Sequence, residues 1–184
     1  MRLFTGIAID PAVLSNLEQV LRELRPLAPL NWSPVENLHI TTRFIGKWPE
    51  QELGEMKHAL EEVHAPAPFP VTIGHFGYFP DPHNPIVLFA GVKAGPELAD
   101  LARRIDERLS PLGLPRQNRP YTPHLTLGKI GNKPIRALRE HIANMKNFDF
   151  GTFQVSEFNL YLSVARSGGS EYKILATYPL GPPA

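Results

Sequence analysis

Two histidines, His39 and His124, each begin a His-x-Thr motif, and such a pair can carry out acid–base chemistry on phosphate. Imidazole titrates near neutral pH, so one copy can act as the neutral base while the other acts as the protonated acid. Alternate residues of a strand point to one face, so Thr41 would project with His39, and Thr126 with His124. Threonine hydroxyls can donate hydrogen bonds to the non-bridging oxygens of a phosphate. The motifs therefore favour phosphoryl transfer without a metal ion.

Other interpretations of the two motifs remain open at this point. A lone His-x-Thr is weak evidence, because a histidine on a strand is usually only a structural side chain. Here each motif is followed by Ile-Gly and then by proline, as in Ile45, Gly46 and Pro49, which makes a shared catalytic cleft the preferred interpretation. Two structural histidines are one alternative. A metal site is the other, and two histidines without a nearby carboxylate ligand make a poor hydrolytic metal site.

An internal repeat gives the two motifs a physical reason to meet. A shift of 85 residues superposes His39 on His124 and needs no gap between positions 3 and 53. The matches fall on apolar, proline and glycine positions, which indicates duplication of one supersecondary unit. Two copies of a unit commonly pack about a pseudo-two-fold axis, so equivalent residues near that axis face each other. Further matched pairs are Leu3 with Leu88, Phe4 with Phe89, Gly6 with Gly91, Pro11 with Pro96, Leu24 with Leu109 and Leu53 with Leu138.

Each repeat unit is predicted to run strand, helix, strand, helix, strand. The first helix shows the typical signals, because Asp10 and Pro11 suit a helix start and apolar residues follow at helical spacing. Proline-rich segments predict a linker at 65–70 and a hinge at 80–85. The expected strands are 2–9, 37–45 and 71–79, then 86–93, 122–130 and 150–162, with one further strand at 171–178. The expected helices are 11–24, 49–63, 96–110 and 134–146.

The fold class predicted from these elements is α+β. With only two helices in each unit, a small mixed or antiparallel sheet with helices on one face is preferred over a parallel α/β sheet. We expect a single bilobal domain over 1–184 with a pseudo-two-fold axis and a central cleft that carries both motifs. The repeat units are expected at about 1–80 and 86–165, with 166–184 as an added C-terminal strand segment.

Composition and charge limit the classes of function. The 184 residues suffice for a sizeable core, and no apolar stretch is long enough to cross a bilayer. The absence of cysteine excludes disulfides and thiol nucleophiles and predicts a cytoplasmic location. Residues 1–85 hold 6 Lys/Arg and 10 Asp/Glu, whereas residues 86–184 hold 13 and 8. The second half can therefore attract a phosphate-bearing ligand, although the net charge of the chain is only +1.

In these contexts the motifs resemble those of the two-histidine (2H) phosphoesterase superfamily. The resemblance is strongest to the RNA 2′,3′-cyclic phosphodiesterases, historically called 2′-5′ RNA ligases. It rests on the segments 37–46 and 121–129, which surround the two motifs. Arg2-Leu3-Phe4 at the start and the late Leu162-Ser163, Gly168-Gly169 and Tyr172 also fit, so the resemblance covers nearly the whole chain.

The resemblance implies a bilobal α+β fold, no metal or other cofactor, and the opening of a 2′,3′-cyclic phosphate to a 2′-phosphate at an RNA end. His39 would protonate the leaving 3′ oxygen and His124 would activate water, although pseudo-symmetry lets the sequence support either order. Thr41 and Thr126 would bind the phosphate. Some relatives also join or cleave 2′-5′ linkages. Relatives often carry arginine in place of Lys129, and because lysine lacks the bidentate fork of arginine, a phosphate contact at this position stays open.

Several arginine and aromatic side chains on the predicted strands and loops could contact substrate. Arg43 shares the strand parity of His39 and would point into the cleft, whereas Phe44 would point to the core. Arg119 and Arg116, in a basic and proline-rich loop, could guide RNA phosphates. Three aromatic residues could stack a terminal base, with core packing or loop anchoring as the alternative for each: Tyr172, Tyr121 and Trp32.

Other polar segments are expected to have no direct role. The segment 167–170 could bind phosphate but is more simply a flexible turn between two strands. Five further histidines have neither a repeat partner nor a motif and are predicted to be surface or structural: His58, His64, His75, His83 and His141.

Three classes of function are consistent with these residues. The leading one is a metal-independent cyclic phosphodiesterase whose partner is RNA with a 2′,3′-cyclic phosphate terminus. The second is a phosphodiesterase on small cyclic nucleotides or 2′-5′ oligonucleotides. The third is a non-catalytic binder of RNA ends, which would have little need for two titratable groups. Neither a membrane nor an obligate protein partner is indicated.

Overall fold

A nine-stranded sheet is the framework of the protein, and every ladder in it is antiparallel. The structure is a computed structural model that describes residues 1–146 and 149–181. The strands are β1 (Arg2–Ala8), β2 (Asn31–Trp32), β3 (His39–Lys47), β4 (Phe69–Phe79), β5 (Val87–Ala94), β6 (His124–Lys129), β7 (Asp149–Val155), β8 (Glu157–Arg166) and β9 (Gly169–Pro179). The α-helices are α1 (Pro11–Leu24), α2 (Leu53–Glu61), α3 (Pro96–Leu109) and α4 (Arg136–Asn144), and short 3-10 turns lie at Arg25–Leu27, Val35–Asn37, Glu50–Glu52 and Ser110–Leu112. The α+β class with an antiparallel sheet is therefore confirmed.

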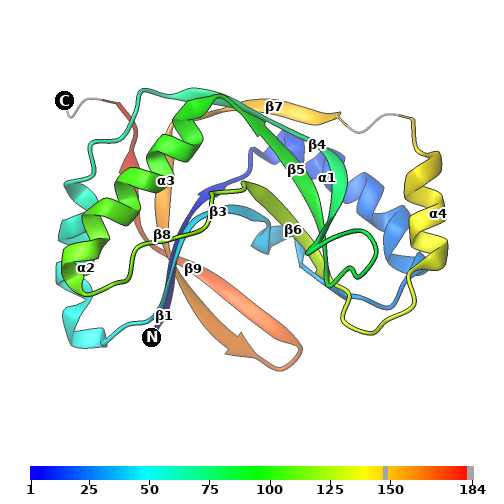
Figure 1. The fold of residues 1–184 in the computed structure, drawn as a ribbon, viewed down its shortest axis with the longest axis horizontal. Coiled ribbons are helices and arrows are strands. Elements are labelled where there is room, and N and C mark those ends of the chain that lie inside the picture. The colour runs from blue at the N-terminus through cyan, green and yellow to red at the C-terminus, as the bar shows by residue number, and fades with distance from the viewer. Residues whose placement is uncertain (147–148, 182–184) are drawn as a thin grey trace.

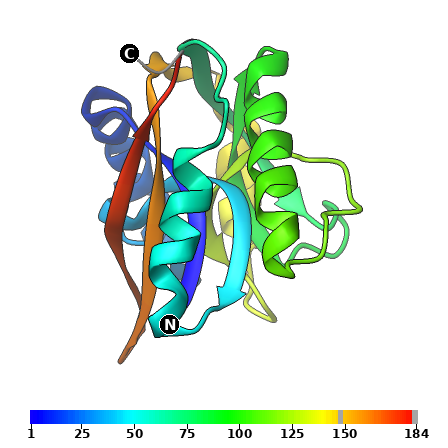
Figure 2. The ribbon, with the colours of Figure 1, turned by 90° about the vertical axis from the view of Figure 1, so that its left-hand side faces the viewer.

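The sheet divides into two lobes between β6 and β3. Its strand order is β7-β4-β5-β6-β3-β1-β8-β9, and the register of β3 with β6 contains one residue pair, Ile40 with Leu125. We call the strands β3, β1, β8 and β9 with α2 and α3 lobe A, and the strands β7, β4, β5 and β6 with α1 and α4 lobe B. Figure 1 shows lobe A to the left and lobe B to the right. In Figure 2, α2 (cyan) lies in front of the strands of lobe A and runs in nearly the same direction as they do.

Both sequence units contribute to each lobe. The last strand of the first unit, β4, pairs with β5 in lobe B, while β8 of the second unit pairs with β1 in lobe A. The helices also cross over, since Asn16 of α1 donates a hydrogen bond to the carbonyl of Phe150 in β7. Each lobe therefore needs both units to complete its sheet and its helical cover.

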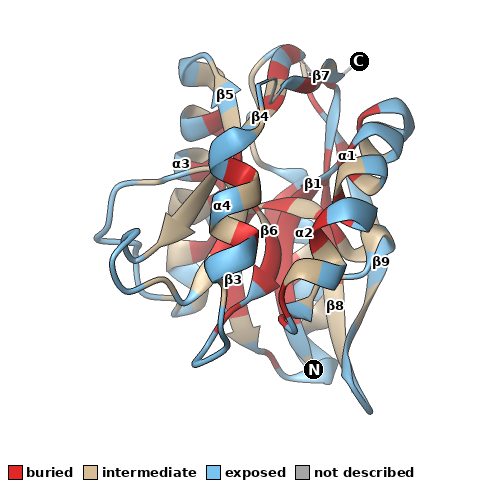
Figure 3. Cartoon of the chain, turned by 90° about the vertical axis from the view of Figure 1, so that its right-hand side faces the viewer, coloured by how far each residue is buried: buried red, intermediate tan, exposed pale blue. Residues whose placement is uncertain are grey.

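The two longest helices have similar sequence signals and confirm the predicted helices at 11–24 and 96–110. In α1 the Asp10 side chain accepts a hydrogen bond from the backbone of Ala12, and Pro11 occupies the first turn. Its buried residues recur at helical spacing and pack into the core. In α3 Pro96 takes the same position after Gly95. Figure 3 shows the buried face of these helices turned to the sheet and the exposed face turned outward.

The predicted strand 150–162 is wrong, because the chain forms two strands there. β7 ends at Val155, β8 begins at Glu157, and the two strands pair in different lobes. Apolar residues alternate on both sides of Ser156 but change phase there, from Phe153 and Val155 to Phe158 and Leu160, and the predicted single strand ignored this change. The short strand β2 was not predicted, and residues 182–184 of the predicted C-terminal segment lie outside the described residues.

A β-bulge interrupts the alternation of β3 just after the first motif. Thr5 pairs with Arg43 while Gly6 pairs with Thr41, so Thr42 is the extra residue. As a result Thr42 and Arg43 are both buried, and Phe44 is 67% exposed. The prediction that Phe44 points to the core is therefore wrong, because the bulge reverses the parity on which that prediction depends.

The two motif strands differ in register by two residues. His39 lies opposite Ala8 on β1, whereas His124 lies opposite Gly91 on β5. Ala8 and Gly91 are 83 residues apart, although the histidines are 85 apart. A slip of two residues leaves every side chain on its original face, because the period of a strand is two. His39 and His124 therefore lie on equivalent faces of their strands despite this slip of two residues.

No helix in the described parts of the chain has the length and apolar character needed to span a membrane.

Candidate active site

The imidazole of His39 is fixed at both nitrogens. Its Nδ1 lies 2.7 Å from the carbonyl oxygen of Asn37, and its Nε2 lies 2.9 Å from Oγ1 of Thr41. A carbonyl only accepts hydrogen bonds, so Nδ1 carries a hydrogen and donates it to Asn37. In the neutral ring Nε2 is then the acceptor, and the Thr41 hydroxyl donates to it. The motif therefore couples the imidazole and the hydroxyl directly.

Aromatic side chains enclose the His39 ring. Phe4 lies 4.7 Å from it between ring centroids, and Tyr172 meets it edge-on at 5.2 Å and 86°. Tyr161 lies 5.9 Å away and stacks on Phe4. Gly6 allows the strands to approach, since a Cβ there would lie 2.9 Å from the carbonyl oxygen of Ile40.

This enclosure determines the protonation of His39. Burial lowers the pKa of His39 below its ordinary value of 6.5, because it disfavours the charged ring. The hydrogen bond to the Asn37 carbonyl opposes the shift, and the nearby charge of His124 adds to it. In the protein alone, His39 is therefore biased to the neutral form at neutral pH.

The imidazole of His124 repeats part of this arrangement in a more open setting. Its Nδ1 lies 2.8 Å from the carbonyl oxygen of Thr122, as Nδ1 of His39 lies beside the carbonyl of the residue two positions earlier. Phe79 and Phe89 pack edge-on against the ring at 4.8 Å and 5.7 Å. Both histidines therefore engage a backbone carbonyl through Nδ1, and in His39 the Nε2 atom also contacts the motif hydroxyl of Thr41. Thr126 lies opposite Phe89 in the ladder and on the same face as His124.

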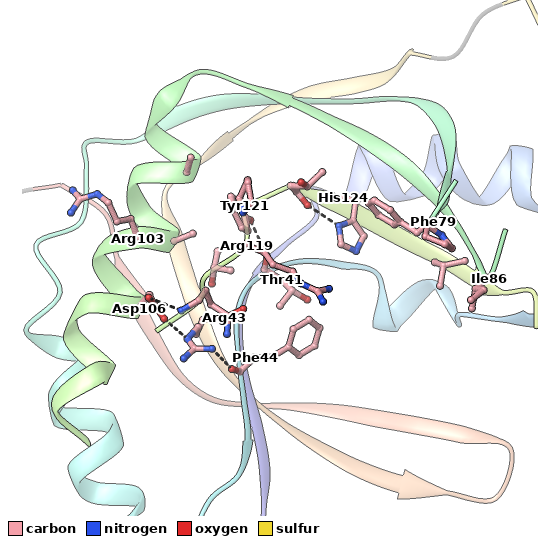
Figure 4. Close-up of a pocket in the computed structure, with 18 residues that line it drawn as sticks. Thr41, Arg43, Phe44, Phe79, Ile86, Arg103, Asp106, Arg119, Tyr121 and His124 are labelled. Atoms are coloured by element: carbon pink, nitrogen blue, oxygen red, sulfur yellow. Dashed lines mark hydrogen bonds and ion pairs between the residues drawn. The ribbon is translucent and has the colours of Figure 1, made fainter. Parts of the chain in front are cut away.

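A cavity of about 910 Å³ lies between the two lobes beside His124. Its wall brings together Thr41 of lobe A and His124 of lobe B, with α3 and the loop before β6 (Figure 4). Phe44 and Ile86 line it and are 67% and 51% exposed. The other lining residues are Thr42, Arg43, Phe79, Pro80, Val87, Ala99, Ala102, Arg103, Asp106, Gln117, Arg119, Pro120, Tyr121 and Thr122. The cavity thus offers a largely apolar surface next to one imidazole and one motif hydroxyl.

Arg43 lines this cavity but is locked into its wall. Its Nε lies 2.7 Å from Oδ1 of Asp106 on α3, and both side chains are largely buried. Its guanidinium also donates to the carbonyls of Phe44 and Pro115. The expectation that Arg43 faces the cleft holds in that it lines the cavity, but after the bulge it pairs with Thr5, and its guanidinium is held by α3 and by backbone carbonyls. No sequence signal identified Asp106, which belongs to the polar face of a helix.

The loop between α3 and β6 is tied to the lobe A strand β3. The Tyr121 hydroxyl donates a hydrogen bond of 2.8 Å to the carbonyl of Thr41, and the backbone of Gln117 donates to Oδ2 of Asp106. Burial raises the pKa of Tyr121, so its hydroxyl stays protonated and remains a donor. Tyr121, taken from the sequence as a stacking candidate, thus also positions the strand that carries Thr41.

The remaining sequence candidates, with one exception, lie outside the wall of the cavity. Tyr172 packs on His39, as described above. Lys129 is exposed at the end of β6, opposite Val87 and Asn31. Trp32 is anchored by its indole nitrogen to the carbonyl of Ala28. Arg116 is exposed in the loop, whereas Arg119, also exposed, lines the cavity.

Comparisons with known proteins agree on one family. The model of the 2′-5′ RNA ligase superfamily matches residues 10–165. An RNA 2′,3′-cyclic phosphodiesterase of Archaeoglobus fulgidus is 32% identical over 97% of this chain and 99% of its own length. One of Methanocaldococcus jannaschii is 30% identical over 95% and 98%.

Solved structures show the same fold. A crystal structure from Thermus thermophilus superposes with a TM-score of 0.81 at 26% identity, covering 98% of both chains. The crystal structure of E. coli LigT complexed with 3′-AMP gives a TM-score of 0.80 at 21% identity over 98% of both chains.

Proposed function

Because the chain belongs to the 2′-5′ RNA ligase superfamily, we propose that it is an RNA 2′,3′-cyclic phosphodiesterase that opens terminal cyclic phosphates to 2′-phosphates. The observation that carries the proposal is the matched pair of imidazoles. His39 and His124 each engage a backbone carbonyl through Nδ1, and Nε2 of His39 is bonded to the Thr41 hydroxyl that the substrate would displace. A pair of positioned titratable groups is what cleavage of a phosphodiester by acid and base requires.

The reaction divides between the two histidines. His124 accepts a proton at Nε2 from a water molecule as the water oxygen bonds to phosphorus. The bond from phosphorus to the 3′ oxygen breaks, and His39 gives that oxygen a proton from its own Nε2. The products are a 2′-phosphate and a free 3′ hydroxyl, and proton exchange with solvent restores both rings. This order follows the resemblance of the chain to its family, and pseudo-symmetry makes the reverse order its direct competitor.

Substrate binding prepares His39 for the acid role. The pKa of His39 is lowered by burial in the protein alone, so the protonated form is depleted at neutral pH. A cyclic phosphodiester carries a negative charge, and an opposite charge within about 4–6 Å favours the protonated ring. The substrate therefore brings about the protonation that its own cleavage needs. The same charge releases the Thr41 hydroxyl from Nε2, so that Thr41 can donate to a phosphate oxygen together with Thr126.

The cavity beside His124 suits the terminal nucleoside. Phe44 and Ile86 supply exposed apolar surface against which a base can pack, and single-stranded RNA is commonly bound by such stacking. Of the arginines on the wall, Arg43 and Arg103 are held in ion pairs with Asp106 and Asp100, and exposed Arg119 remains for the sugar-phosphate. Lys129 would contact the substrate from the rim of the site. Tyr172 would support the substrate site from behind His39. The cysteine-free composition suits a reducing, cytoplasmic setting.

One assay tests this function. The protein is incubated with EDTA and an RNA oligonucleotide that ends in a 2′,3′-cyclic phosphate, and the terminus of the product is identified. We expect a 2′-phosphate from the wild type and from His64→Ala, a histidine outside the cavity that serves as control. His39→Ala and His124→Ala should each abolish it. Tight binding without turnover would instead indicate a binder of RNA ends, and loss of activity in EDTA would overturn the metal-free mechanism.

A further inference from the structure

A second cavity, of about 680 Å³, lies on lobe B away from the first. Its polar lining comes from three neighbouring strands: Thr72 and His75 of β4, Lys93 of β5, and Asp149 and Thr152 of β7. It is completed by Pro70, Gly74, Ala94 and Gly95. None of these residues belongs to the reaction centre described above.

The second cavity opens on the same face of the lobe B sheet as His124. Residues paired across a ladder share a face, and Gly91 pairs with His124 on one side and with Gly74 on the other. Two residues further along β5, Lys93 lies on that face opposite Thr72. The α1 helix covers the opposite face, where a Cβ on Gly151 would lie 3.1 Å from Val13. One face of the described sheet, which we call the floor, therefore runs without interruption from His124 to the second cavity.

His75 has an unusual backbone that turns its ring onto this floor. It is a non-glycine residue with a φ of 51°, at the bulge of β4 between Gly74 and Phe76. Such a conformation is uncommon and strained for a residue with a side chain. The ring occupies the place that a Cβ on Gly91 would fill, and such a Cβ would also lie 2.7 Å from the Gly74 carbonyl oxygen, so the backbone favours glycine there. The bulge and the glycine together hold an exposed imidazole one ladder position from His124.

The chemistry of the second cavity suits the backbone and base of a nucleotide. Lys93 is exposed and lies two residues from Gly91, which is about 7 Å along a strand, so its long side chain reaches the space beside the reaction centre. The hydroxyls of Thr72 and Thr152 are hydrogen-bonded to each other at 2.7 Å, so the pair has one further O–H donor to offer. Asp149 turns Oδ1 to the backbone of Gly151, which donates to it at 2.8 Å. Imidazole rings stack on unpaired bases and bond to their edges.

We propose that this cavity, the lobe B groove, binds the nucleotide that precedes the terminal one in the RNA substrate. Lys93 contacts the phosphodiester that joins the two nucleotides, and His75 contacts the base. The proposal rests on the function proposed above and adds to it a preference for oligonucleotides over mononucleotides. The apolar cavity beside His124 takes the terminal nucleoside, and the polar groove takes the chain that leads away from it.

The test compares two substrates of different length. A nucleoside 2′,3′-cyclic monophosphate reaches only the reaction centre, whereas a trinucleotide with the same terminus also fills the groove. We expect His75→Gly and Lys93→Ala to leave kcat/KM for the mononucleotide unchanged and to lower it for the trinucleotide by about five-fold or more, the scale of one lost base stack. Glycine tolerates the backbone of His75, and His75→Asn also suits it, so folding is preserved.

Binding measurements separate the groove from the reaction itself. The affinity for a trinucleotide ending in a 2′-phosphate is measured by fluorescence anisotropy over a range of salt concentrations, which requires no turnover. Lys93→Ala should reduce the slope of log affinity against log salt by about 0.7, the value for one phosphate contact on a single strand. The matched control is Lys133→Ala, which lines a different surface hollow beside α4.

Each outcome decides the proposal. Weaker binding of the trinucleotide by the His75 and Lys93 variants, with binding of the mononucleotide unchanged, supports the groove even if no cleavage is detected. Unchanged trinucleotide binding overturns it, as does an equal loss on both ligands. A larger effect of Lys133→Ala would place the RNA strand on another surface and also overturns it.

Discussion

The two half-sites around His39 and His124 share their anchoring but differ in their surroundings. Each ring engages the carbonyl of the residue two positions earlier, at 2.7 and 2.8 Å. His39 is enclosed by Phe4, Tyr161 and Tyr172 and bonded to Thr41, whereas His124 lines an open cavity. The internal sequence repeat predicted this equivalent placement of the two histidines. The differences between the copies bury one ring and leave the other at a cavity, and burial lowers the pKa of His39 below its ordinary value.

The largest expected effect comes from removing either ring. His39→Ala and His124→Ala should each lower kcat on a cyclic phosphate by about 10²–10⁴, the range for loss of one general acid or base. The losses should be of similar size despite the different burial, because both groups act in the same step. Steady-state kinetics of the two variants beside His64→Ala measures this. A variant of either histidine with near wild-type turnover would contradict the shared site.

The next largest effect concerns the Arg43–Asp106 ion pair in the cavity wall, which lobe A has and lobe B lacks. Arg43 pairs with Asp106, while the equivalent position 85 residues later is Gly128. Arg43→Ala should lower the free energy of unfolding by about 3–5 kcal/mol, because it leaves a largely buried carboxylate without its partner. Urea denaturation measures the change. Arg22→Ala, at an exposed ion pair, should change it by less than about 0.5 kcal/mol.

A double replacement tests whether the buried charges of Arg43 and Asp106 determine the stability of the cavity wall. Arg43→Met combined with Asp106→Leu removes both buried charges and should recover most of the lost stability, since a buried pair is often replaced by apolar residues at little cost. If the double variant is as unstable as Arg43→Ala, the wall depends on the hydrogen bonds of Arg43 to the carbonyls of Phe44 and Pro115 instead.

A smaller effect reports on the enclosure of His39. Tyr172→Ala opens one side of the ring to water, so the pKa of His39 should rise toward its ordinary value of 6.5. Titration of the imidazole resonances by NMR measures the shift. Ile174→Ala, on the same strand and 55% exposed, should leave the pKa unchanged. If the pKa of His39 stays low in Tyr172→Ala, groups other than Tyr172 exclude water from the imidazole.

The smallest effect is a pH dependence of stability. The pKa of His39 is lower in the folded than in the unfolded chain, so the unfolded chain binds more protons between the two values. The stability that neutral His39 contributes is complete above pH 6.5 and is lost as the pH falls toward the lowered value. His39→Gln should remove this component from the pH profile of the urea midpoint. An unchanged profile would show that His39 does not titrate differently on folding.

The sequence predicted those site residues whose direction follows from the repeat and from regular strand periodicity, and it did not predict the others. The repeat and the strand period were sufficient to place His39 with Thr41 and His124 with Thr126 on common faces. They were not sufficient for Arg43 and Phe44, because a β-bulge shifts the parity and leaves no mark in residue types. The break at Ser156 does leave a mark, a change in the phase of the apolar alternation, which the single predicted strand passed over.

Tertiary contacts account for the other differences from the sequence-based predictions. Asp106 acts through an ion pair across the fold, which helical periodicity does not predict. His75 was predicted to be surface or structural, and its side chain is exposed, but the sequence did not indicate its place beside His124. Its ring lies on the floor beside His124 only because a bulge and Gly91 meet there.

The pH dependence of kcat/KM in single-histidine variants tests the central claim most directly. The wild type should give a bell-shaped profile on an RNA cyclic phosphate, with one limb for each histidine. His39→Asn should lose the fall at high pH, because the acid that must stay protonated is gone, and His124→Asn should lose the fall at low pH. The opposite assignment of limbs would exchange the roles of the two histidines. A bell that persists unchanged in either variant would contradict a mechanism based on this pair.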